Sequence, residues 1–256
     1  MLGAIAGDII GSVYEAHPVK SAEFPLFSRY STFTDDTVLT VAVAYAILER
    51  AEYAETLKSF GRRYPDAGYG MSFYHWMFSP SAAPYNSWGN GSAMRVSPVG
   101  FACDSVEDVL HEAERSAAVT HNHPEGIKGA QATALAIFFA RRRESKETIK
   151  REIQERFDYN LERTLDDIRP WYSFDVSCQG SVPESIIAFL EAESFEDAIR
   201  KAVSLGGDSD TMACIAGGIA HAFYGEVPEN IAASVRVRLP EEFLLIIDRF
   251  NAAYGL

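Results

Sequence analysis

The stretch from residue 205 to residue 220 constrains the fold most, because two glycines lead there into polar residues and then into an apolar run of small side chains. Glycine reaches backbone angles that a Cβ forbids, so Gly206 and Gly207 predict a tight turn. Asp208 or Ser209 then fits the cap position of a helix. A helix that is apolar on all sides is buried in the core, so the polar groups at its start need partners.

Two carboxylates and a hydroxyl, from Asp208, Asp210 and Thr211, stand at this helix start. Carboxylates in that position could simply stabilise the positive end of the helix dipole. Carboxylate and hydroxyl oxygens are also the ligands that a hard cation such as Mg²⁺ prefers. One such stretch leaves both interpretations open.

A second acidic helix start lies far away in the sequence, where Thr34, Asp35 and Asp36 precede an apolar run over 38–48. Two such starts can converge in a helical fold, and together they would supply four carboxylates and at least two hydroxyls. This donor set can hold two metal ions roughly 3.5–4 Å apart, an arrangement that polarises a substrate and delivers a metal-bound water. The pair of stretches therefore favours a metal site over dipole stabilisation alone.

The net charge of −13 arises from 23 basic and 36 acidic residues among 256. Nucleic-acid binding needs a basic face, so we expect no nucleic-acid partner. An acidic protein that binds phosphate groups needs cations in its site, and bound metal ions would supply them. The candidate ligands are all oxygen donors without His or Cys, which favours Mg²⁺, with Mn²⁺ as a substitute, over zinc.

The cysteines Cys103, Cys178 and Cys214 are widely spaced and lack nearby Cys or His partners, so they predict neither disulfides nor zinc. The apolar N-terminal run is too short and too rich in glycine to span a membrane, and Asp8 interrupts it. It also lacks the basic segment of a secretory signal. We expect a cytoplasmic monomer without membrane contact.

Helical periodicity recurs along the chain, and no alternating pattern typical of strands is long enough to be convincing. The predicted helices cover residues 4–14, 36–52, 54–64, 106–120, 125–143, 146–157, 181–192, 195–205, 208–224, 229–237 and 241–254. Residues 65–91 form the longest irregular segment, and its aromatic residues favour a functional loop. With no repeat and no linker, we expect a single compact all-α domain over residues 1–256.

Four motifs occur in a fixed order along the chain. They are Gly3-Ala-Ile-Ala-Gly-Asp-Ile-Ile-Gly-Ser-Val-Tyr-Glu15, Thr34-Asp-Asp-Thr37, Gly89-Asn-Gly-Ser-Ala-Met-Arg95 and Gly207-Asp-Ser-Asp-Thr211. Together they resemble the ADP-ribosylglycohydrolases, the dimagnesium enzymes related to the dinitrogenase-reductase-activating glycohydrolase. The resemblance extends from residue 1 to about residue 225, which is nearly the whole chain.

This resemblance implies an all-α domain with a dinuclear metal site at converging helix N-termini. It implies two Mg²⁺ ions with the ligands Thr34, Asp35, Asp36, Asp208, Asp210 and Thr211. The implied reaction is hydrolysis at C1″ of the distal ribose in an ADP-ribose-containing small molecule or an ADP-ribosylated protein. The motifs do not specify the leaving group (arginine, serine, an acyl ester or a nucleobase). The segment 11–17 is closer to the branch that acts on O-linked ADP-ribose than to the arginine branch.

A glycine-rich turn precedes the third motif's helix and offers backbone N–H groups that suit a phosphate, although Gly-Asn-Gly is also a common turn. In the family this loop holds the pyrophosphate and ribose of ADP-ribose. The resemblance thus implies substrate binding by Ser87, Trp88, Gly89, Asn90, Gly91 and Ser92. Trp88 occupies the place of an aromatic residue that stacks on adenine, or it could instead be a core anchor. Arg95 is expected to form an ion pair that supports the fold rather than to bind the substrate.

His121 and His123 alternate in a Thr-His-Asn-His-Pro-Glu segment that at first resembles a metal site. A hydrogen-bonded helix start with Pro124 near its first position is the plain structural interpretation. In the family a histidine matching His121 lies near the distal ribose or the adenine. We prefer this role for His121 to metal binding.

Glu15 follows the first predicted helix and could be an exposed end-of-helix carboxylate. The resemblance implies a glutamate beside the metals that acts on the glycosidic centre or gates access to it. We predict that Glu15 transfers the proton during hydrolysis, with Asp36 or Asp210 as the rival. Asp8, inside the same helix, is either a satisfied polar residue or a support for a metal ligand.

Two other functions remain open from the sequence alone. A dimetal phosphoesterase acting on a nucleotide would cleave the pyrophosphate and release AMP. A non-catalytic protein, like the crystallin relatives of this family, would keep the fold without turnover. Such a protein is expected to lose metal ligands, and all six are present here.

Overall fold

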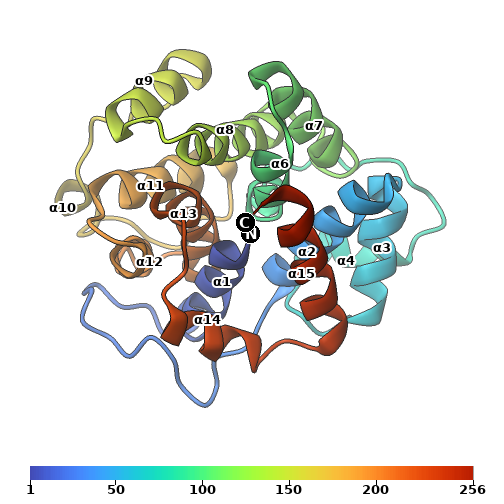
Figure 1. Cartoon of the computed structure of the whole chain (residues 1–256), viewed down its shortest axis with the longest axis horizontal. Coiled ribbons are helices and arrows are strands. Elements are labelled where there is room, and N and C mark those ends of the chain that lie inside the picture. The colour runs from blue at the N-terminus through green and yellow to red at the C-terminus, as the bar shows by residue number, and fades with distance from the viewer. Residues whose placement is uncertain (256) are drawn as a thin grey trace.

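The predicted central helix is α13 (Ser209–Tyr224) in a computed structural model that describes residues 1–255 (Figure 1). Its residues are buried from its start to His221, and its cap residue Asp208 makes no side-chain hydrogen bond to the helix. Gly206 has a φ of 64°, a left-handed conformation that favours glycine. The tight turn predicted before this helix is therefore confirmed.

Helix α1 (Leu2–Glu15) packs along α13 in the middle of the molecule (Figure 1), and glycines of α1 allow the two backbones to approach closely. A Cβ at Gly7 would lie 2.0 Å from the carbonyl oxygen of Ala213. One at Gly11 would lie 2.4 Å from the carbonyl oxygen of Ser209. This packing brings the end of α1 next to the start of α13.

Further helices surround this pair (Figure 1) and complete an all-α fold in one compact domain, as predicted. Across the described residues there is no strand, only an isolated antiparallel bridge between Gly89 and Ser177. The surrounding helices are α2 (Asp35–Glu49), α3 (Tyr53–Arg63), α4 (Met71–Phe78), α5 (Gly91–Met94), α6 (Ser97–Ala102), α7 (Val106–Ala118), α8 (Pro124–Arg141), α9 (Lys146–Phe157), α10 (Leu165–Ile168), α11 (Cys178–Glu191), α12 (Phe195–Val203), α14 (Glu229–Arg236) and α15 (Glu241–Tyr254).

Some elements differ from the sequence predictions. The segment 65–91 is not irregular throughout, because α4 forms within it and buries the aromatic rings of Phe73 and Trp76. The helices α5, α6 and α10 contain only four, six and four residues. Helices α6 and α10 span too few turns to show a period in the sequence, so they escaped prediction, whereas a helix after the glycine-rich turn was expected and α5 forms there.

Helix α11 begins at Cys178 rather than at the predicted residue 181. Ser177 caps it by accepting a hydrogen bond from the N–H of Gly180 at 3.1 Å. Pro183 lies inside the helix, beyond the first turn where proline is typical. The thiol of Cys178 is buried and free, like that of Cys214, so no disulfide forms among the described residues, as predicted.

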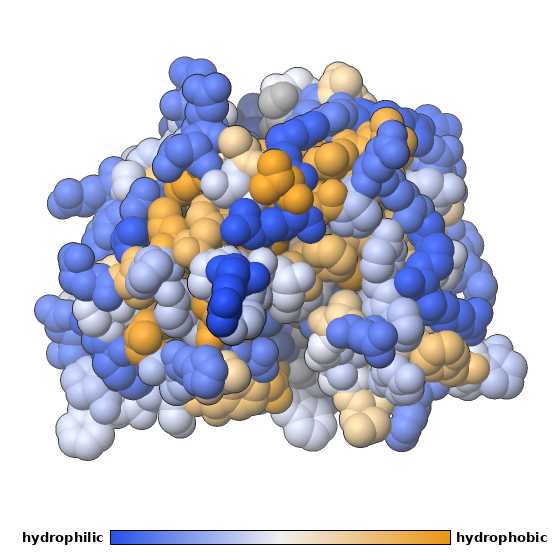
Figure 2. All heavy atoms as spheres, turned by 90° about the horizontal axis from the view of Figure 1, so that it is seen from below, coloured by the Kyte–Doolittle hydropathy of each residue, from blue (hydrophilic) through white to orange (hydrophobic). Residues whose placement is uncertain are grey.

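The exterior of the molecule is mixed in polarity. Figure 2 shows one face, on which hydrophilic residues surround separate hydrophobic patches. Within residues 1–255, no helix combines the length and the apolar character that crossing a membrane requires.

The close packing of α1 on α13 can be tested by adding one methyl group. We expect Gly7→Ala to lower the free energy of unfolding by about 1–3 kcal/mol, because its Cβ would clash with the backbone of α13. Gly218→Ala on α13 is the matched control, since its Cβ would meet neighbours at 3.4 to 3.5 Å. Replacing this helical glycine should stabilise the protein by up to about 1 kcal/mol. Denaturant titration measures both, and a Gly7→Ala protein as stable as the wild type would contradict the packing.

Candidate functional site

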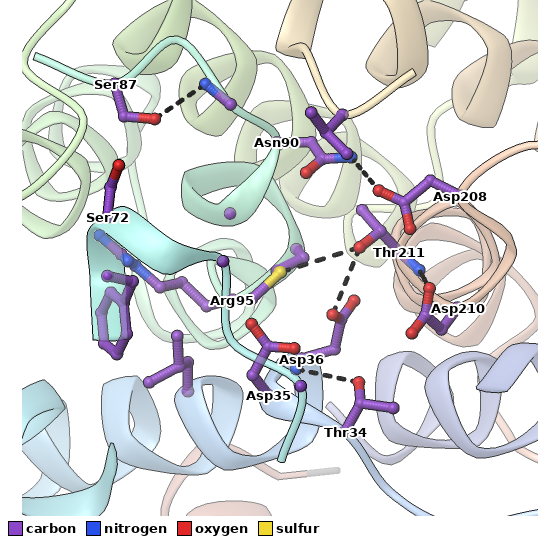
Figure 3. Close-up of a pocket in the computed structure, with 18 of the residues that line it drawn as sticks. Thr34, Asp35, Asp36, Ser72, Ser87, Asn90, Arg95, Asp208, Asp210 and Thr211 are labelled. Atoms are coloured by element: carbon purple, nitrogen blue, oxygen red, sulfur yellow. Dashed lines mark hydrogen bonds between the residues drawn. The ribbon is translucent and has the colours of Figure 1, made fainter. Parts of the chain in front are cut away.

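A cavity of about 450 Å³ lies between the starts of α2 and α13 and the glycine-rich turn before α5 (Figure 3). The six predicted metal ligands are all on its wall, namely Thr34, Asp35, Asp36, Asp208, Asp210 and Thr211. The predicted substrate-binding residues on its wall are Ser87, Gly89, Asn90, Gly91 and His121. The two acidic helix starts, far apart in sequence, therefore converge on one cavity.

The start of α2 is held by a buried carboxylate from α1. Asp8 Oδ1 accepts a hydrogen bond from the Thr34 hydroxyl at 2.7 Å. Asp8 Oδ2 accepts from the backbone N–H groups of Thr34 and Thr37, each at 3.0 Å, and from the Thr37 hydroxyl. Thr34 in turn caps the helix by accepting from the N–H of Asp36 at 3.3 Å. Asp8 is thus a satisfied polar residue, and it also positions Thr34, which is a predicted metal ligand.

The start of α13 directs its carboxylates towards the cavity instead of using them to cap the helix (Figure 3). Asp208 Oδ2 accepts a hydrogen bond from Asn90 Nδ2 at 2.8 Å. Asp210 Oδ1 accepts from the N–H of Thr211 at 2.9 Å. The Thr211 hydroxyl lies 3.3 Å from Asp36 Oδ2 and donates to it, which links α13 to α2. The acidic residues at this helix start therefore face the cavity and form hydrogen bonds there, which stabilisation of the helix dipole alone would not require.

Glu15 is the last residue of α1 and reaches the same cavity. One carboxylate oxygen each from Glu15, Asp208 and Asp210 lies within 4.8 Å of the other two. The C-terminal end of a helix disfavours a negative charge. Burial, and then the neighbouring Asp210, raise the pKa of Glu15. The carboxyl group of Glu15 therefore lies where either a proton or a bound cation would stabilise it.

The carboxylates of the cavity crowd one another. Burial raises the pKa of Asp35, Asp36 and Asp208 well above the usual range, and repulsion from Asp210 raises it further. In the described part of the chain no Lys, Arg or His forms an ion pair with them. Asp36 Oδ1 is buried without any hydrogen-bond donor. An orphaned oxygen in an all-oxygen donor set fits a hard divalent cation, so this acidic group could bind a metal ion.

The glycine-rich turn is tied to both the segment before α11 and the start of α13. The N–H of Asn90 donates to the carbonyl oxygen of Val176 at 2.7 Å, and the N–H of Cys178 donates to that of Trp88 at 2.9 Å. The Asn90 side chain makes the contact with Asp208 described above. Asn90 therefore positions a carboxylate, a role that its place in the predicted phosphate-binding turn did not reveal.

Two predicted substrate residues lie outside the cavity wall. Trp88 is 53% exposed, and its ring meets that of His123 edge to face, so it is not a core anchor. Ser92 is buried and donates to the carbonyl oxygen of Gly126 at 2.7 Å, which directs its hydroxyl towards α8. Adenine stacking on Trp88 stays a prediction for a ligand that extends beyond the cavity.

His121 lies on the cavity wall as a neutral imidazole. Burial, and then the nearby Arg95, lower its pKa well below the ordinary value, and its Nδ1 lies 2.7 Å from the Thr120 hydroxyl. His121 does not belong to the set of residues whose carboxylates could together hold a metal ion, namely Glu15, Asp208 and Asp210. His123 caps α8 by accepting from the N–H of Glu125 at 3.1 Å, so the predicted helix start is confirmed.

The predicted ion pair of Arg95 is wrong. The guanidinium is fully buried, and no carboxylate pairs with it in the described part of the chain. Its Nη2 instead donates to the carbonyl oxygen of Ser116 and to the hydroxyl of Thr120, both at 2.8 Å. Neutral groups of α7 and of the turn after it therefore take the place of the expected acidic partner.

Other cavity residues carry no motif and escaped sequence reasoning. Ser72, Phe73 and Tyr85 come from the segment 65–91, where only the aromatic content favoured a function. Phe174 and Val176 come from the irregular segment before α11, which offered no signal beyond its lack of a period. These residues reach the cavity through long-range packing that no local pattern encodes.

The protein is all-α, and an acidic cavity that could bind a metal ion lies beside a glycine-rich turn. Comparisons with known proteins identify the family to which a protein with this fold and site belongs. The sequence matches the ADP-ribosylglycohydrolase family over residues 1–254. The chain therefore belongs to the ADP-ribosylglycohydrolase family, a family of hydrolases. The resemblance seen in the sequence is confirmed.

Several relatives are similar over most of their length. The ADP-ribosylhydrolase ARH3 of Homo sapiens is 30% identical, and the match covers 90% of this chain and 86% of the human protein. The ADP-ribosylarginine hydrolase Tri1 of Pseudomonas putida is 25% identical, with 88% of this chain and 69% of that protein covered. A solved structure described as an ADP-ribosylglycohydrolase-related protein complex has a TM-score of 0.74 at 25% identity, covering 96% of this chain and 93% of that one.

The crowding of carboxylates makes a testable prediction about stability. Mg²⁺ should raise the Tm of the wild type, because an ion that binds only the folded state stabilises it. In EDTA, Asp36→Asn should melt at the wild-type temperature or above it, since the substitution removes one of several repelling charges. The same variant should lose most of the rise that Mg²⁺ causes.

Differential scanning fluorimetry with and without Mg²⁺ measures these shifts. Asp66→Asn is the control, because Asp66 is exposed and is not on the cavity wall. An Asp36→Asn protein that keeps the full Mg²⁺-induced rise would show that Asp36 does not take part in metal binding.

Proposed function

We propose that this protein hydrolyses the C1″ linkage of the distal ribose in an ADP-ribose conjugate, in a reaction that depends on Mg²⁺. The observation that carries the proposal is the convergence of five carboxylates on one cavity beside a glycine-rich turn: Glu15, Asp35, Asp36, Asp208 and Asp210. The relatives named as ADP-ribosylhydrolase and ADP-ribosylarginine hydrolase support the same class of substrate.

In this proposal the metal ligands are Thr34, Asp35, Asp36, Asp208, Asp210 and Thr211, which would hold two Mg²⁺ ions, with Mn²⁺ as a substitute. Ions bound there would polarise substrate oxygens and lower the pKa of a bound water. Two of these ligands, Asp208 and Asp210, form with Glu15 a group of carboxylates that could hold a metal ion. The orphaned Asp36 oxygen and the absence of a basic partner in the described chain also support the assignment.

The protein's own side chains would handle charge and protons. Glycoside hydrolysis develops positive charge at the anomeric carbon, and nearby carboxylates stabilise such a charge. Glu15 would accept a proton from the attacking water on a carboxylate oxygen. Its raised pKa supports this role, because a proton acceptor works best when its pKa approaches the operating pH. Asp36 and Asp210 remain the rival acceptors.

The glycine-rich turn would bind the diphosphate. A Cβ at Gly91 would lie 3.1 Å from His121 Nε2, and one at Gly89 would lie 3.2 Å from the Ser87 hydroxyl. The missing side chains keep these polar atoms accessible to a ligand on the cavity wall. Neutral His121 can then donate or accept one hydrogen bond without adding charge.

Product analysis tests the proposed reaction. The protein would be incubated with peptides ADP-ribosylated on arginine or on serine, and with O-acetyl-ADP-ribose, in Mg²⁺ and in EDTA. We expect release of free ADP-ribose that EDTA abolishes, and the preferred substrate identifies the leaving group. Release of AMP would indicate a phosphoesterase instead, and the absence of turnover on every conjugate would indicate a non-catalytic protein.

The proton-transfer role of Glu15 makes a kinetic prediction. Glu15→Gln keeps nearly the same shape, so affinity for ADP-ribose and metal content should be preserved. Turnover should fall roughly 10²–10⁴-fold, the usual contribution of one positioned acid or base. The loss should appear in kcat rather than in KM, because the interaction matters most in the transition state.

Steady-state kinetics and metal analysis separate the possible roles of Glu15. Glu23→Gln, at an exposed position outside the cavity, is the control. Loss of bound metal together with activity would identify Glu15 as a ligand. A kcat close to that of the wild type would assign the proton to Asp36 or Asp210.

Adenine stacking on Trp88 also has a measurable consequence. Trp88→Ala should weaken ADP-ribose binding by about 1–3 kcal/mol, the usual scale of base–aromatic stacking, while stability changes little because the ring is exposed. Trp171→Ala is a matched control, since Trp171 is 88% exposed and is also outside the cavity wall. Isothermal titration calorimetry measures the ADP-ribose affinity of both variants and of the wild type. A Trp88→Ala affinity equal to that of the wild type would rule out stacking on Trp88.

A further inference from the structure

The cavity contains a buried positive charge that nothing in the mechanism uses. Arg95 follows the glycine-rich turn, lies on the cavity wall and is fully buried. Figure 3 shows its side chain extending towards Ser72, away from Asp208 and Asp210. Arg95 therefore lies on the same cavity wall as Asp208 and Asp210 but points away from them.

Arg95 satisfies only part of its hydrogen-bonding capacity. The two bonds to Ser116 and Thr120 both come from Nη2. Nε and Nη1 have no acceptor, although both atoms are buried. A guanidinium carries five N–H donors, so the unused donors are those of Nε and Nη1. A buried donor without an acceptor destabilises a fold unless something else supplies one.

The charge of Arg95 also lacks a counter-charge. The groups that favour it electrostatically are Tyr85, Cys178 and Tyr53, none of them a carboxylate. Burial raises the pKa of Tyr85 and of Cys178 to about 12 each, so both are neutral near pH 7. Burial lowers the pKa of Arg95 to about 10, so the guanidinium stays charged. Buried charges are normally paired, and this one has no partner within the described chain.

Positive and negative charges lie at different places on the cavity wall, so a charged ligand would favour one orientation in the cavity. His121 is neutral, so Arg95 is the only cationic side chain among the described residues of the wall. An anion is repelled by the carboxylate side and attracted by the Arg95 side. Because the site is buried, the field of a fixed charge is weakened less than it would be in water.

We propose that Arg95 is the positioning residue that selects a phosphate-bearing substrate and sets its direction in the cavity. Its fixed positive charge, acting across the wall, supplies the counter-charge for a diphosphate, so the distal ribose of the same molecule meets the carboxylates. The inference deepens the proposed function and rests on it for the identity of the reacting end. Arg95 would therefore cause the preference for phosphate-bearing ligands, because the acidic residues on the rest of the wall repel a phosphate.

The test compares two ligands that differ only in phosphate. ADP and adenosine both lack the distal ribose, so their binding in EDTA depends on neither metal nor catalysis. The wild type should bind ADP more tightly than adenosine, and the difference should shrink as NaCl increases. Arg95→Gln should weaken ADP binding about 10- to 100-fold, the scale of one charge acting at short range in a partly desolvated site, with adenosine affinity almost unchanged. Arg95→Lys should retain most of the ADP preference.

A matched variant controls for loss of structural support. Arg141 is a partly buried arginine that donates to backbone carbonyls away from the cavity, and Arg141→Gln should leave the ratio of the two affinities unchanged. If Arg95→Gln weakens both ligands equally, Arg95 only supports the fold and the proposal is overturned. The wild type alone is also decisive, because equal affinity for ADP and adenosine would overturn the proposal even if the variant fails to fold.

The outcomes for the two proposals are separable. An ADP preference that depends on Arg95, without hydrolysis of any ADP-ribose conjugate, would leave the positioning role standing and reject the reaction. Hydrolysis with an affinity ratio that Arg95→Gln does not change would support the reaction and reject the role of Arg95.

Discussion

Repulsion among five acidic side chains on one cavity wall, three of them buried, is the constraint on which the rest of this structure depends. Carboxylates that share a low-dielectric site disfavour one another's ionisation, and here no basic side chain of the described chain pairs with them. The fold therefore holds them by packing. The glycines of α1 seat its backbone against α13, and Asp8 fixes the start of α2 through hydrogen bonds to Thr34 and Thr37. These packing and hydrogen-bond restraints hold the acidic groups near one another although no basic side chain of the described chain neutralises them.

Much of this arrangement could be predicted from the sequence, because its determinants are local. Three of these determinants can be interpreted physically from a few neighbouring residues: the two acidic helix starts, the glycine turn before α13 and the small residues of α1. Their convergence was a possibility that the two helix starts raised together, since carboxylates at the heads of buried helices need a neutralising partner. The family resemblance added the substrate class, which spacing and composition alone do not contain.

What escaped prediction depends on contacts between distant segments. The bond between Asn90 and Asp208 joins residues 118 positions apart, so a residue interpreted as a phosphate binder also orients a carboxylate. Phe174 and Val176 reach the cavity because the segment before α11 pairs with the glycine-rich turn. Arg95 was expected to meet an acidic partner, since most buried arginines do. Only the packed structure reveals that its partners are a hydroxyl and a carbonyl.

These long-range contacts join the two ends of the cavity into one unit. Asn90 lies between them, with its backbone bound to the segment before α11 and its side chain bound to Asp208. A few residues later the same segment of chain carries Arg95 and its buried charge. Displacement of the turn would therefore move a carboxylate and a cation together. In the proposed mechanism, substrate orientation and the geometry of the acidic group would share this short segment, so specificity and chemistry would be mechanically coupled.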